Sequence, residues 1–460
     1  MLSLASSLPG FTTSSNPSLL QQHGKGESHH PSAPPCLVCS PADTSQVQAL
    51  VRLCGEHGVP VVPHGAGTSL EGHLSHLDPR PSISLSLNNL AALASLSVPS
   101  RTATAGAGLT RLSLNEQLRG TGLHFSVDPG ADASLGGMAA CAASGTSAVR
   151  YGTMRDAVRA MTVVTAGGEQ VNTGSLASKS AAGYDLNALY MGSEGTLGVI
   201  TELTLNLHPL PSHVSSAVTV FPSLSAASKS VVDMLLLGVP LAKVEILDRS
   251  AIRAFNAYAA NVPDLREAPT LFLEFHGISE EELAAQVAMA KDACEGHGSS
   301  EFEFAAGERE RRELWAARHG TYYASVRLRP GAGGVVTDAC VPLEHLAEVI
   351  EETAADIERE QIVGTVFGHA GDGNFHCILP VREDDPADYL AKIEAFNGRL
   401  IERTLAKGGT CSGEHGVGSG KMLYLKQQYN APTVGVMRAV KKALDPKNIM
   451  NPGKIFSWDE

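Results

Sequence analysis

The sequence predicts an α+β protein with more than one domain. Its 460 residues exceed what one ordinary hydrophobic core holds, so we expect two or three domains. Pro209-Leu-Pro211 follows a long predicted strand, Val199 to His208, and marks a natural boundary. Beyond this boundary, predicted strands alternate regularly with charged helices. That alternation indicates a sheet covered by helices on one face.

The bulk composition excludes several classes of function. Hydrophobic residues make up 43% of the chain, yet no apolar stretch reaches the length needed to cross a bilayer. A transmembrane protein is therefore not expected, whereas association with a membrane surface stays compatible with the sequence. The net charge of −13 argues against a nucleic-acid partner and is compatible with docking of a basic protein.

The cysteines and the amino terminus bear on the compartment. Eight cysteines are dispersed along the chain, and only Cys36 and Cys39 form a CxxC pair, which fits a reducing compartment. The first 26 residues contain no Asp, Glu or Arg, which is half of a transit-peptide signature because the arginines are missing. We expect a mitochondrial protein or, failing that, one of another reducing soluble compartment.

A glycine-rich loop follows the first predicted helix and strand. The helix covers residues 44–58 and the strand runs from Val59 to Pro63. A Rossmann fingerprint would need a third glycine where this loop has Leu70, so that fold is disfavoured. The backbone N–H groups of residues 64–72 can instead converge into an anion nest for a pyrophosphate. A plain glycine turn is the alternative interpretation of this loop taken alone.

Two further segments consist largely of small side chains. One extends from Pro129 to Thr146, and the other is Gly192-Ser-Glu-Gly-Thr-Leu-Gly198, which opens a predicted strand. Small residues let the backbone approach a large flat partner closely, as binding of a flavin or a nucleotide requires. Three such segments at wide spacing favour a common ligand.

The second half has the regular alternation on which the fold class depends. The predicted strands lie near 243–247, 270–276, 301–305, 335–341 and 361–367, and the predicted helices near 249–260, 279–296, 307–326, 343–360 and 386–406. The last forty residues are mostly helical in pattern.

Two short glycine-punctuated segments carry residues typical of a metal site. His369 and His376 flank Ala-Gly-Asp-Gly-Asn-Phe, which suggests a strand, a tight bend and a returning strand. Glu414-His415 lies between glycines further along. Two histidines with one glutamate and an open position are the pattern of a catalytic metal site, and imidazole with carboxylate suits zinc or manganese. Ordinary core or surface histidines are the alternative, and Asp372 competes as a ligand or only shapes the bend.

The loops together resemble a known class of flavoproteins. Residues 63–72, 127–132, 144–156 and 190–198 resemble the FAD-binding domain of the vanillyl-alcohol-oxidase/PCMH class, and the second half resembles the type-4 oxidase C-terminal domain of that class. The resemblance covers the chain from about residue 20 to its end. It implies an N-terminal segment (1–31), a two-subdomain PCMH-type FAD-binding domain (32–211), an α+β substrate and metal-binding cap domain with an antiparallel sheet (212–420), and a C-terminal helical segment that returns to the FAD domain (421–460).

The resemblance also implies a set of FAD contacts. Members that bond the flavin covalently use a histidine later in the loop than His64, so we expect non-covalent FAD. The implied cofactor residues are Pro63, His64, Gly65, Ala66, Gly67, Thr68, Ser69, Leu70, Gly72, Pro129, Gly130, Asp132, Gly136, Gly137, Ala140, Ser144, Gly145, Tyr151, Gly152, Glu194, Gly198, Ile200 and Asn451.

The same resemblance assigns roles around the two metal-site segments. It implies His369, His376 and Glu414 as metal ligands and His415 as the catalytic base, which also contacts the substrate. It places Arg318 where the class holds a substrate carboxylate, and Asn374 is a weaker candidate for substrate contact. These residue types suit the oxidation of a 2-hydroxy acid, because a metal lowers the pKa of a coordinated hydroxyl and a neutral histidine takes its proton.

The activity implied is the FAD- and divalent-metal-dependent oxidation of D-lactate, or a similar D-2-hydroxy monocarboxylate, with electrons passed to cytochrome c or another acceptor. Relatives that oxidise D-2-hydroxyglutarate hold its second carboxylate with a Lys-Tyr-Asp triplet, whereas this chain has Val336-Thr-Asp338 and therefore no cation. Glycolate and D-2-hydroxyglutarate remain alternative substrates. Alternatives of other classes are a non-redox flavin transferase, a metallohydrolase without flavin, and a flavin-storage protein.

Overall fold

The computed structural model describes residues 11–27, 29–259, 264–305 and 307–458. The chain divides into two compact units. Unit 1 comprises residues 1–144, 152–210 and 414–460, and unit 2 comprises residues 145–151 and 211–413. The chain thus leaves unit 1 twice, first for residues 145–151 and later for residues 211–413.

Unit 1 contains a first sheet of four short strands in the order β1-β2-β4-β3. β2 (Leu37–Ser40), β4 (Ile83–Ser86) and β3 (Val61–His64) run parallel, and β1 (Thr12–Ser14) pairs with β2 antiparallel. Helix α3 (Thr44–His57) is capped by the Asp43 side chain and ends at Gly58 in the left-handed conformation. Its buried face packs on these strands, as the helical period of its apolar residues predicts.

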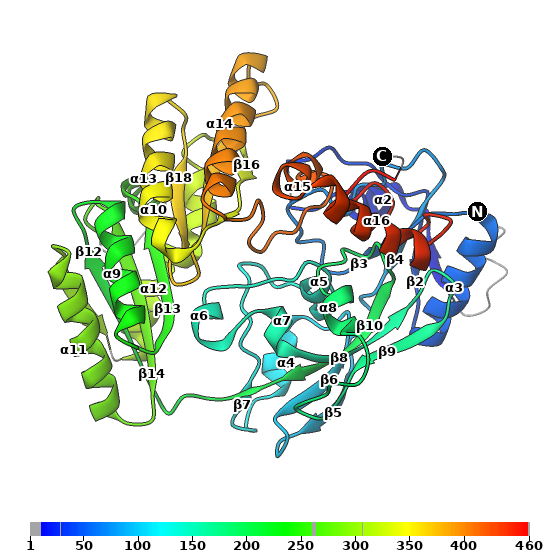
Figure 1. Ribbon diagram of the computed structural model, residues 1–460, viewed down its shortest axis with the longest axis horizontal. Helices are drawn as coiled ribbons and strands as arrows, with labels where there is room; N and C mark the ends of the chain where they lie inside the picture. Colours follow the sequence, from blue (N-terminus) through cyan, green and yellow to red (C-terminus); the bar gives the residue numbers. More distant parts are fainter. Residues whose placement is uncertain (1–10, 28, 260–263, 306, 459–460) are drawn as a thin grey trace. The chain divides into compact units, whose positions relative to one another are not determined.

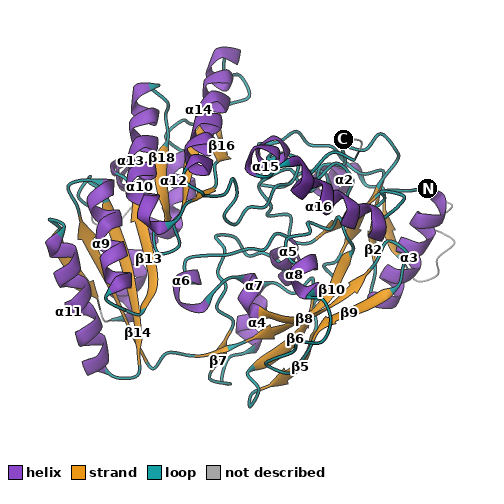
Figure 2. Cartoon of the chain, in the orientation of Figure 1, coloured by secondary structure: helices purple, strands orange, loops and turns teal. Residues whose placement is uncertain are grey.

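A second sheet of unit 1 is fully antiparallel and has the order β5-β6-β10-β8-β9 (Figure 2). Its strands are β5 (Leu93–Ser97), β6 (Thr102–Gly106), β8 (Val158–Val164), β9 (Gln170–Gly174) and β10 (Val199–Asn206). Four short helices of the unit accompany it: α4 (Arg111–Gln117), α5 (Leu135–Ala140), α7 (Met154–Ala157) and α8 (Leu186–Tyr190). Helix α6 (Ala148–Tyr151) belongs to unit 2, where it contacts β13. A two-stranded ribbon pairs β7 (Leu123–His124) with β11 (His208–Pro209). Two sheets with separate cores are the two subdomains expected of this half.

Both ends of the chain contribute to unit 1. Helices α15 (Met422–Gln428) and α16 (Ala431–Leu444), red in Figure 1, belong to it, and Met450 forms a β-bridge with Val61. At the other end, α2 (Pro17–His23) buries His23 against Ser84 of β4. Of the segment considered for targeting, residues 1–10 lie outside the described residues, while the strand and helix that follow pack as part of the unit.

Unit 2 is built on one antiparallel sheet of eight strands, in the order β15-β12-β14-β13-β18-β19-β16 with β17 also paired to β19. The strands are β12 (His213–Val220), β13 (Leu241–Leu247), β14 (Thr270–Gly277), β15 (Ser300–Ala305), β16 (Gly333–Val336), β17 (Ala339–Cys340), β18 (Thr365–His369) and β19 (Asn374–Val381). The predicted strand 335–341 is divided in two at Thr337 and Asp338; the backbone oxygen of Thr337 and the side chain of Asp338 contribute to the site described below.

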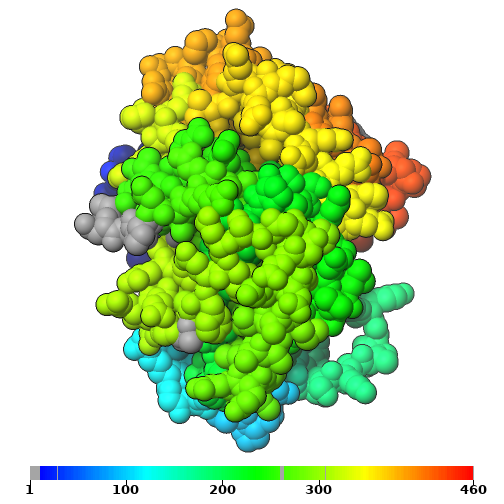
Figure 3. Space-filling view, turned by 90° about the vertical axis from the view of Figure 1, so that its left-hand side faces the viewer, coloured from blue at the N-terminus to red at the C-terminus, as the bar shows by residue number. Residues whose placement is uncertain are grey.

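Helices cover both faces of this sheet, so the expectation of a single covered face was wrong. One core joins the sheet to α9 (Leu224–Leu236), α11 (Glu280–Gly296), α13 (Leu343–Arg359) and α14 (Ala387–Ala406), and the other joins it to α10 (Arg249–Tyr258) and α12 (Glu308–Val326). Alternate residues of β14 show the division, because Leu271 and Leu273 face the first set and Phe272 the second. Figure 3 looks onto unit 2, whose surface is formed there by residues coloured green to yellow. The sequence pattern also missed β12 and α9.

No helix in the described part of the chain is long and apolar enough to cross a membrane.

Candidate active site and flavin-binding unit

The predicted strand–bend–strand around the two histidines is present in unit 2. β18 ends at His369 and β19 begins at Asn374, with a four-residue turn between them. Gly373 in this turn has a φ of +75°, and a Cβ there would lie 2.1 Å from the carbonyl oxygen of Val341. Only glycine fits such a position. Asp372, the competing ligand, is exposed in the turn.

The hairpin brings the imidazoles of His369 and His376 together, and their partners define the tautomer of each ring. The two ring centroids are 5.5 Å apart with the planes at 83°. His369 Nδ1 lies 2.6 Å from Oε1 of Glu245, and His376 Nδ1 lies 3.0 Å from the backbone oxygen of Thr337. A carboxylate and a carbonyl only accept, so both Nδ1 atoms donate and both lone pairs are on Nε2. This is the arrangement found in histidines that ligate a metal.

Arg318 of α12 belongs to the same cluster. Its Nε donates to Oε2 of Glu245 at 2.6 Å, and its guanidinium stacks over the ring of Phe367 with 4.7 Å between the guanidinium carbon and the ring centroid. The side chain is 13% exposed, whereas that of Glu245 is fully buried. Since the hydrogen bond uses Nε, the two terminal amino groups form the fork that suits a carboxylate.

Asn374 is held by a second buried carboxylate. Its amide nitrogen donates to Asp338 Oδ1 at 2.7 Å and to the backbone oxygen of Ala339 at 2.9 Å, and Ser412 donates to the other oxygen of Asp338. The Oδ1 atom of Asn374 is buried without a hydrogen-bond partner among the described residues. A Cβ at Gly413 would lie 2.2 Å from the amide nitrogen, so only glycine allows this approach. The arrangement leaves one buried acceptor for a ligand.

Glu414 and His415 fall in unit 1, directly after the last residue of unit 2. Within unit 1, His415 Nδ1 lies 3.9 Å from Glu71 Oε1, and Glu71 lies 3.1 Å from Lys421 Nζ. Burial by itself would raise the pKa of Glu71. Lys421, His30 and His415 together lower it by more than burial raises it, so the pKa of Glu71 is below its usual value. A carboxylate beside a histidine orients the ring and stabilises its protonated form. The sequence pattern assigned no role to Glu71.

The three small-residue segments of the first half converge in unit 1. A Cβ at Gly65 would lie 2.1 Å from Ser134 Oγ, and one at Gly195 would lie 3.0 Å from Pro63. The backbone N–H of Glu194 donates to the carbonyl oxygen of Ala140 in α5. The three segments therefore meet within the unit, as a common ligand would require, and their contacts leave little room for larger side chains.

The first loop fits a phosphate-bearing cofactor. Within the described chain, the backbone N–H groups of residues 65–72 donate to no backbone carbonyl, and Gly67 and Gly72 have φ values of +79° and +72°. The buried hydroxyl oxygens of Ser69 and Ser193 have no hydrogen-bond partner among the described residues. Convergent backbone donors with positive-φ glycines form the nests that bind pyrophosphate, so these residues fit FAD.

Other residues expected to contact FAD have protein partners in the structure. Asp132 accepts a hydrogen bond from the backbone N–H of Leu112, and the hydroxyl of Tyr151, in unit 2, lies 2.7 Å from His276 Nδ1. Asn451 donates to the backbone oxygen of Glu194 at 2.7 Å. These contacts show what holds each side chain in place.

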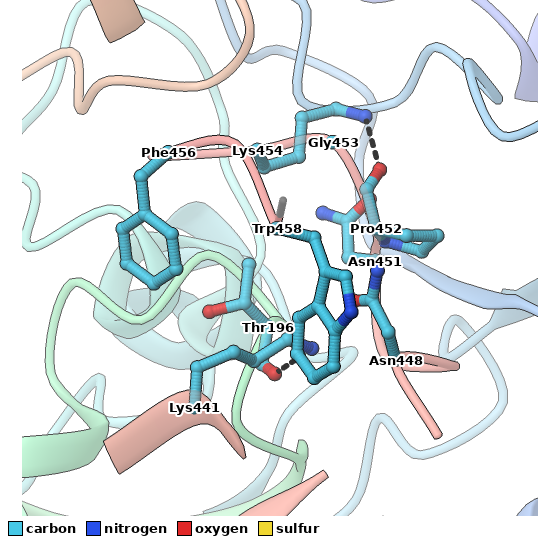
Figure 4. A pocket seen from close by; sticks show the side chains of 9 residues that line it. All are labelled: Thr196, Lys441, Asn448, Asn451, Pro452, Gly453, Lys454, Phe456 and Trp458. Carbon is cyan, nitrogen blue, oxygen red and sulfur yellow. Dashed lines mark hydrogen bonds between the residues drawn. The ribbon is translucent and has the colours of Figure 1, made fainter. Parts of the chain in front are cut away.

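Asn451 also lines a small pocket of unit 1, drawn in Figure 4. Its other lining residues are Thr196, Lys441, Asn448, Pro452, Gly453, Lys454, Phe456 and Trp458. Lys441 donates to the backbone oxygen of Thr196 at 2.7 Å, and burial lowers the pKa of Lys454 to about 8. The pocket has room for about one water molecule, far less than a flavin needs.

Together, the two subdomains of unit 1, their converging glycine loops and the antiparallel sheet of unit 2 define a flavoprotein of the vanillyl-alcohol-oxidase/PCMH class. Two family models match the chain: an FAD binding domain over residues 35–174 and the C-terminal domain of FAD linked oxidases over residues 210–455. The chain belongs to the FAD-linked oxidase family.

Relatives are similar over nearly the whole chain. A probable mitochondrial D-lactate dehydrogenase of Danio rerio is 44% identical over 95% of this chain and 87% of its own length. The mitochondrial D-lactate dehydrogenase [cytochrome] of Arabidopsis thaliana is 41% identical over 94% of this chain and 76% of its own. Glycolate oxidase subunit GlcD of Bacillus subtilis is 31% identical over 92% and 90%.

Solved structures share the fold at low identity. The 4-ethylphenol oxidase from Gulosibacter chungangensis superposes with a TM-score of 0.77 at 19% identity, covering 97% of this chain and 94% of its own. p-Cresol methylhydroxylase does so with a TM-score of 0.78 at 16% identity, with the same coverage. At such identities the likeness establishes the fold alone.

Proposed function

We propose that the protein is an FAD-dependent dehydrogenase that oxidises D-lactate, or a similar D-2-hydroxy monocarboxylate, to the 2-oxo acid. The observation that carries this proposal is the cluster of Arg318, Glu245, His369 and His376 in unit 2, which offers a carboxylate-binding fork beside two histidines with lone pairs on Nε2. The names of the relatives from Danio rerio and Arabidopsis thaliana support the same substrate. FAD, when bound, supplies the acceptor for the hydride that leaves the substrate α-carbon.

A divalent cation fits the donor set of His369, His376 and Glu414. Two imidazoles and one carboxylate with an open position suit zinc or manganese, and the tautomers of both histidines are already those that a cation needs. Glu414 follows Gly413, whose Cα packs against Asn374, so chain connectivity supports its assignment to the same set. The cation, when bound, lowers the pKa of a coordinated hydroxyl.

Individual side chains bind the substrate and accept its proton. The terminal amino groups of Arg318 bind the substrate carboxylate in a fork-to-fork geometry. Asn374 offers its buried Oδ1 to a substrate donor. His415 takes the hydroxyl proton, and Glu71 beside it stabilises the imidazolium that forms.

The surroundings of Arg318 favour a substrate with one carboxylate. A second carboxylate would need a cation, and the place where related enzymes have lysine is occupied by Val336. Lys243, on the same face of the sheet, already pairs with Glu274 at 3.6 Å. A buried second carboxylate would remain without a partner, so D-2-hydroxyglutarate is disfavoured, while glycolate and longer aliphatic 2-hydroxy acids fit.

The acceptor and compartment follow from the relatives. Cytochrome c or another one-electron acceptor re-oxidises the flavin in this proposal, because the Arabidopsis thaliana relative is named for a cytochrome. Both of these relatives are named as mitochondrial, and we infer the same compartment here.

Anaerobic reduction of the bound flavin tests the proposal. The FAD-loaded protein is mixed with D- and L-lactate, glycolate and D-2-hydroxyglutarate, and the flavin absorbance is followed. D-lactate should bleach the flavin quickly and L-lactate should not; a chelator should slow the reaction, and added zinc or manganese should restore it. A protein whose flavin is bleached by none of these acids is not a 2-hydroxy-acid dehydrogenase. Bleaching that survives chelation would remove the metal from the proposal.

A further inference from the structure

Glu245 lies between two groups that the proposed function uses for different purposes. Its carboxylate accepts from Arg318 Nε on one oxygen and from His369 Nδ1 on the other, each at 2.6 Å. It sits in the middle of β13, and its side chain is fully buried. A buried charge on a strand covered by helices on both faces has to be compensated, and these two donors provide the compensation.

Register and side-chain direction explain why these groups meet. β13 pairs with β18 so that Glu245 lies directly opposite His369. On the other side, Glu245 pairs with Phe272 of β14, whose ring belongs to the core shared with α12. Glu245 therefore faces α12, which supplies Arg318. A shift of the β13–β18 register by one residue would turn Glu245 to the opposite face and separate all three groups.

We propose that Glu245 is a positioning residue that couples carboxylate recognition to cation binding, which rests on the proposed function. By accepting from Nδ1, it keeps the proton of His369 on that atom and the lone pair on Nε2. By accepting from Nε, it turns the terminal amino groups of Arg318 toward the substrate carboxylate. One carboxylate thus fixes both groups, and disturbing it changes both.

His376 provides an internal contrast. Its Nδ1 lies 3.0 Å from the backbone oxygen of Thr337 and 3.8 Å from Oδ1 of Asp338, so its tautomer does not depend on Glu245. Of the two histidines, only His369 depends on Glu245. The effect of altering Glu245 on a bound cation should therefore pass through His369 alone.

Glu245→Gln is the informative variant because it keeps the shape of the side chain. Its amide oxygen still accepts from Arg318, while its NH₂ group now faces His369 Nδ1 and can only donate. His369 must then place its proton on Nε2 to satisfy that donor, and the lone pair is lost from the atom that binds the cation. A carboxylate-to-amide change beside a catalytic histidine acts in the same way in serine proteases.

The experiment measures zinc binding to the FAD-loaded protein by competition with a chromophoric chelator, without substrate. Glu245→Gln should weaken zinc binding about 10- to 100-fold, with FAD content and the circular dichroism spectrum unchanged. In steady-state assays, kcat should fall and the KM for D-lactate should rise, because a neutral amide holds the Arg318 guanidinium less firmly than the carboxylate does. Glu274→Gln is the matched control, since Glu274 lies on the same face of the sheet and pairs with Lys243 and His276. It should bind zinc as the parent does.

A double-mutant cycle decides whether the effect passes through His369. If it does, Glu245→Gln combined with His369→Ala loses no more zinc affinity than His369→Ala alone. Additive losses would overturn the inference, as would parent-like zinc affinity and KM in Glu245→Gln. If Glu245→Gln fails to fold, Glu245→Asp takes its place in the cycle, and additive losses with that variant would overturn the inference equally.

Failure of the proposed function gives a different result. A parent protein that binds no zinc and whose flavin no D-2-hydroxy acid reduces would sink the proposed function and this inference together. A parent protein that does both, beside a Glu245→Gln variant that also does both, would sink the inference alone.

Discussion

Acid should destabilise unit 1 through two buried histidines near the cofactor loop. His64 ends β3, stacks on His23 with 3.9 Å between ring centroids, and is 7% exposed. His76 is also buried, and its Nδ1 lies 2.7 Å from Oγ of Ser82. Burial, with a smaller effect from His23, lowers the pKa of His64 from 6.5 to about 4. Burial, with smaller effects from Lys454, His64 and His23, lowers the pKa of His76 to about 3.

The sign follows from proton binding in the two states. Between pH 6.5 and pH 4 the unfolded chain binds protons on these rings and the folded chain does not. Proton binding lowers the free energy of the unfolded state, so folding stability falls as the pH falls. Their contribution is fully present above pH 6.5 and is lost as the pH drops toward the folded pKa values. From pH 7 to pH 5 each ring should remove about 2 kcal/mol from the free energy of unfolding, since one pKa unit corresponds to about 1.4 kcal/mol.

Urea unfolding at pH 7 and pH 5, at a fixed FAD concentration and followed by circular dichroism, measures this loss. His64→Phe keeps a flat ring in the same place but cannot be protonated. The difference between its stabilities at the two pH values should be about 2 kcal/mol smaller than that of the parent protein. His57→Gln, an exposed histidine at the end of α3, is the control and should leave the difference unchanged. A His64→Phe protein with the same acid loss as the parent would refute the reasoning.

Three further predictions concern the site. Arg318→Lys should lower kcat/KM for D-lactate about 100-fold, mostly through KM, because lysine cannot form the two-pronged contact with a carboxylate. The control, Arg312→Lys at an exposed position, should have no effect. If the two variants have equal kinetics, Arg318 does not belong to the site. His415→Ala should lower kcat about 10²- to 10⁴-fold with FAD content unchanged, as measured by flavin absorbance and turnover, and normal turnover would exclude it as the base. Gly373→Ala should lower the free energy of unfolding by about 2–4 kcal/mol, because its φ is positive and Val341 lies in the way; an unchanged urea midpoint would contradict this.

The periodicity of apolar residues along the sequence predicted most of the individual helices and strands. The helix over 44–58 and the strands near 243–247 and 270–276 are present within a few residues of their predicted ends, because the period of their apolar residues matches the buried face. The hairpin around His369 and His376 was predicted from the glycines that its turn requires. Strand β12 and helix α9 were missed. The buried residues Leu224, Ala227, Val231 and Met234 of α9 do recur at helical spacing, but the serines and alanines between them weaken the contrast between its apolar and polar faces.

The partners of the site residues could not be predicted in the same way. Glu245 lies 124 positions from His369, and Glu71 lies 344 positions from His415 (415 − 71), so each pair depends on how separate elements are placed. The signal for Glu245 was a charged residue between the apolar residues Val244 and Ile246 of the strand Leu241 to Leu247. A charged residue in this strand needs a partner because helices cover both faces of the sheet. With only one face expected to be covered, Glu245 could have pointed to solvent, so no partner was predicted.

The order of residues along the chain was enough to predict the residue types of the proposed chemistry and the loops that fit a flavin. Glycines required by positive φ or close approach, histidines with metal-ligand spacing and small-residue segments are local requirements that can be read along the chain. Only the tertiary structure determined which nitrogen of each histidine, His369 and His376, carries the lone pair. It also determined which nitrogens of Arg318 are left for a ligand, and that the Glu245 carboxylate holds both His369 and Arg318. Those properties depend on strand register and on the faces that β13 and α12 present to each other, and no single segment contains that information.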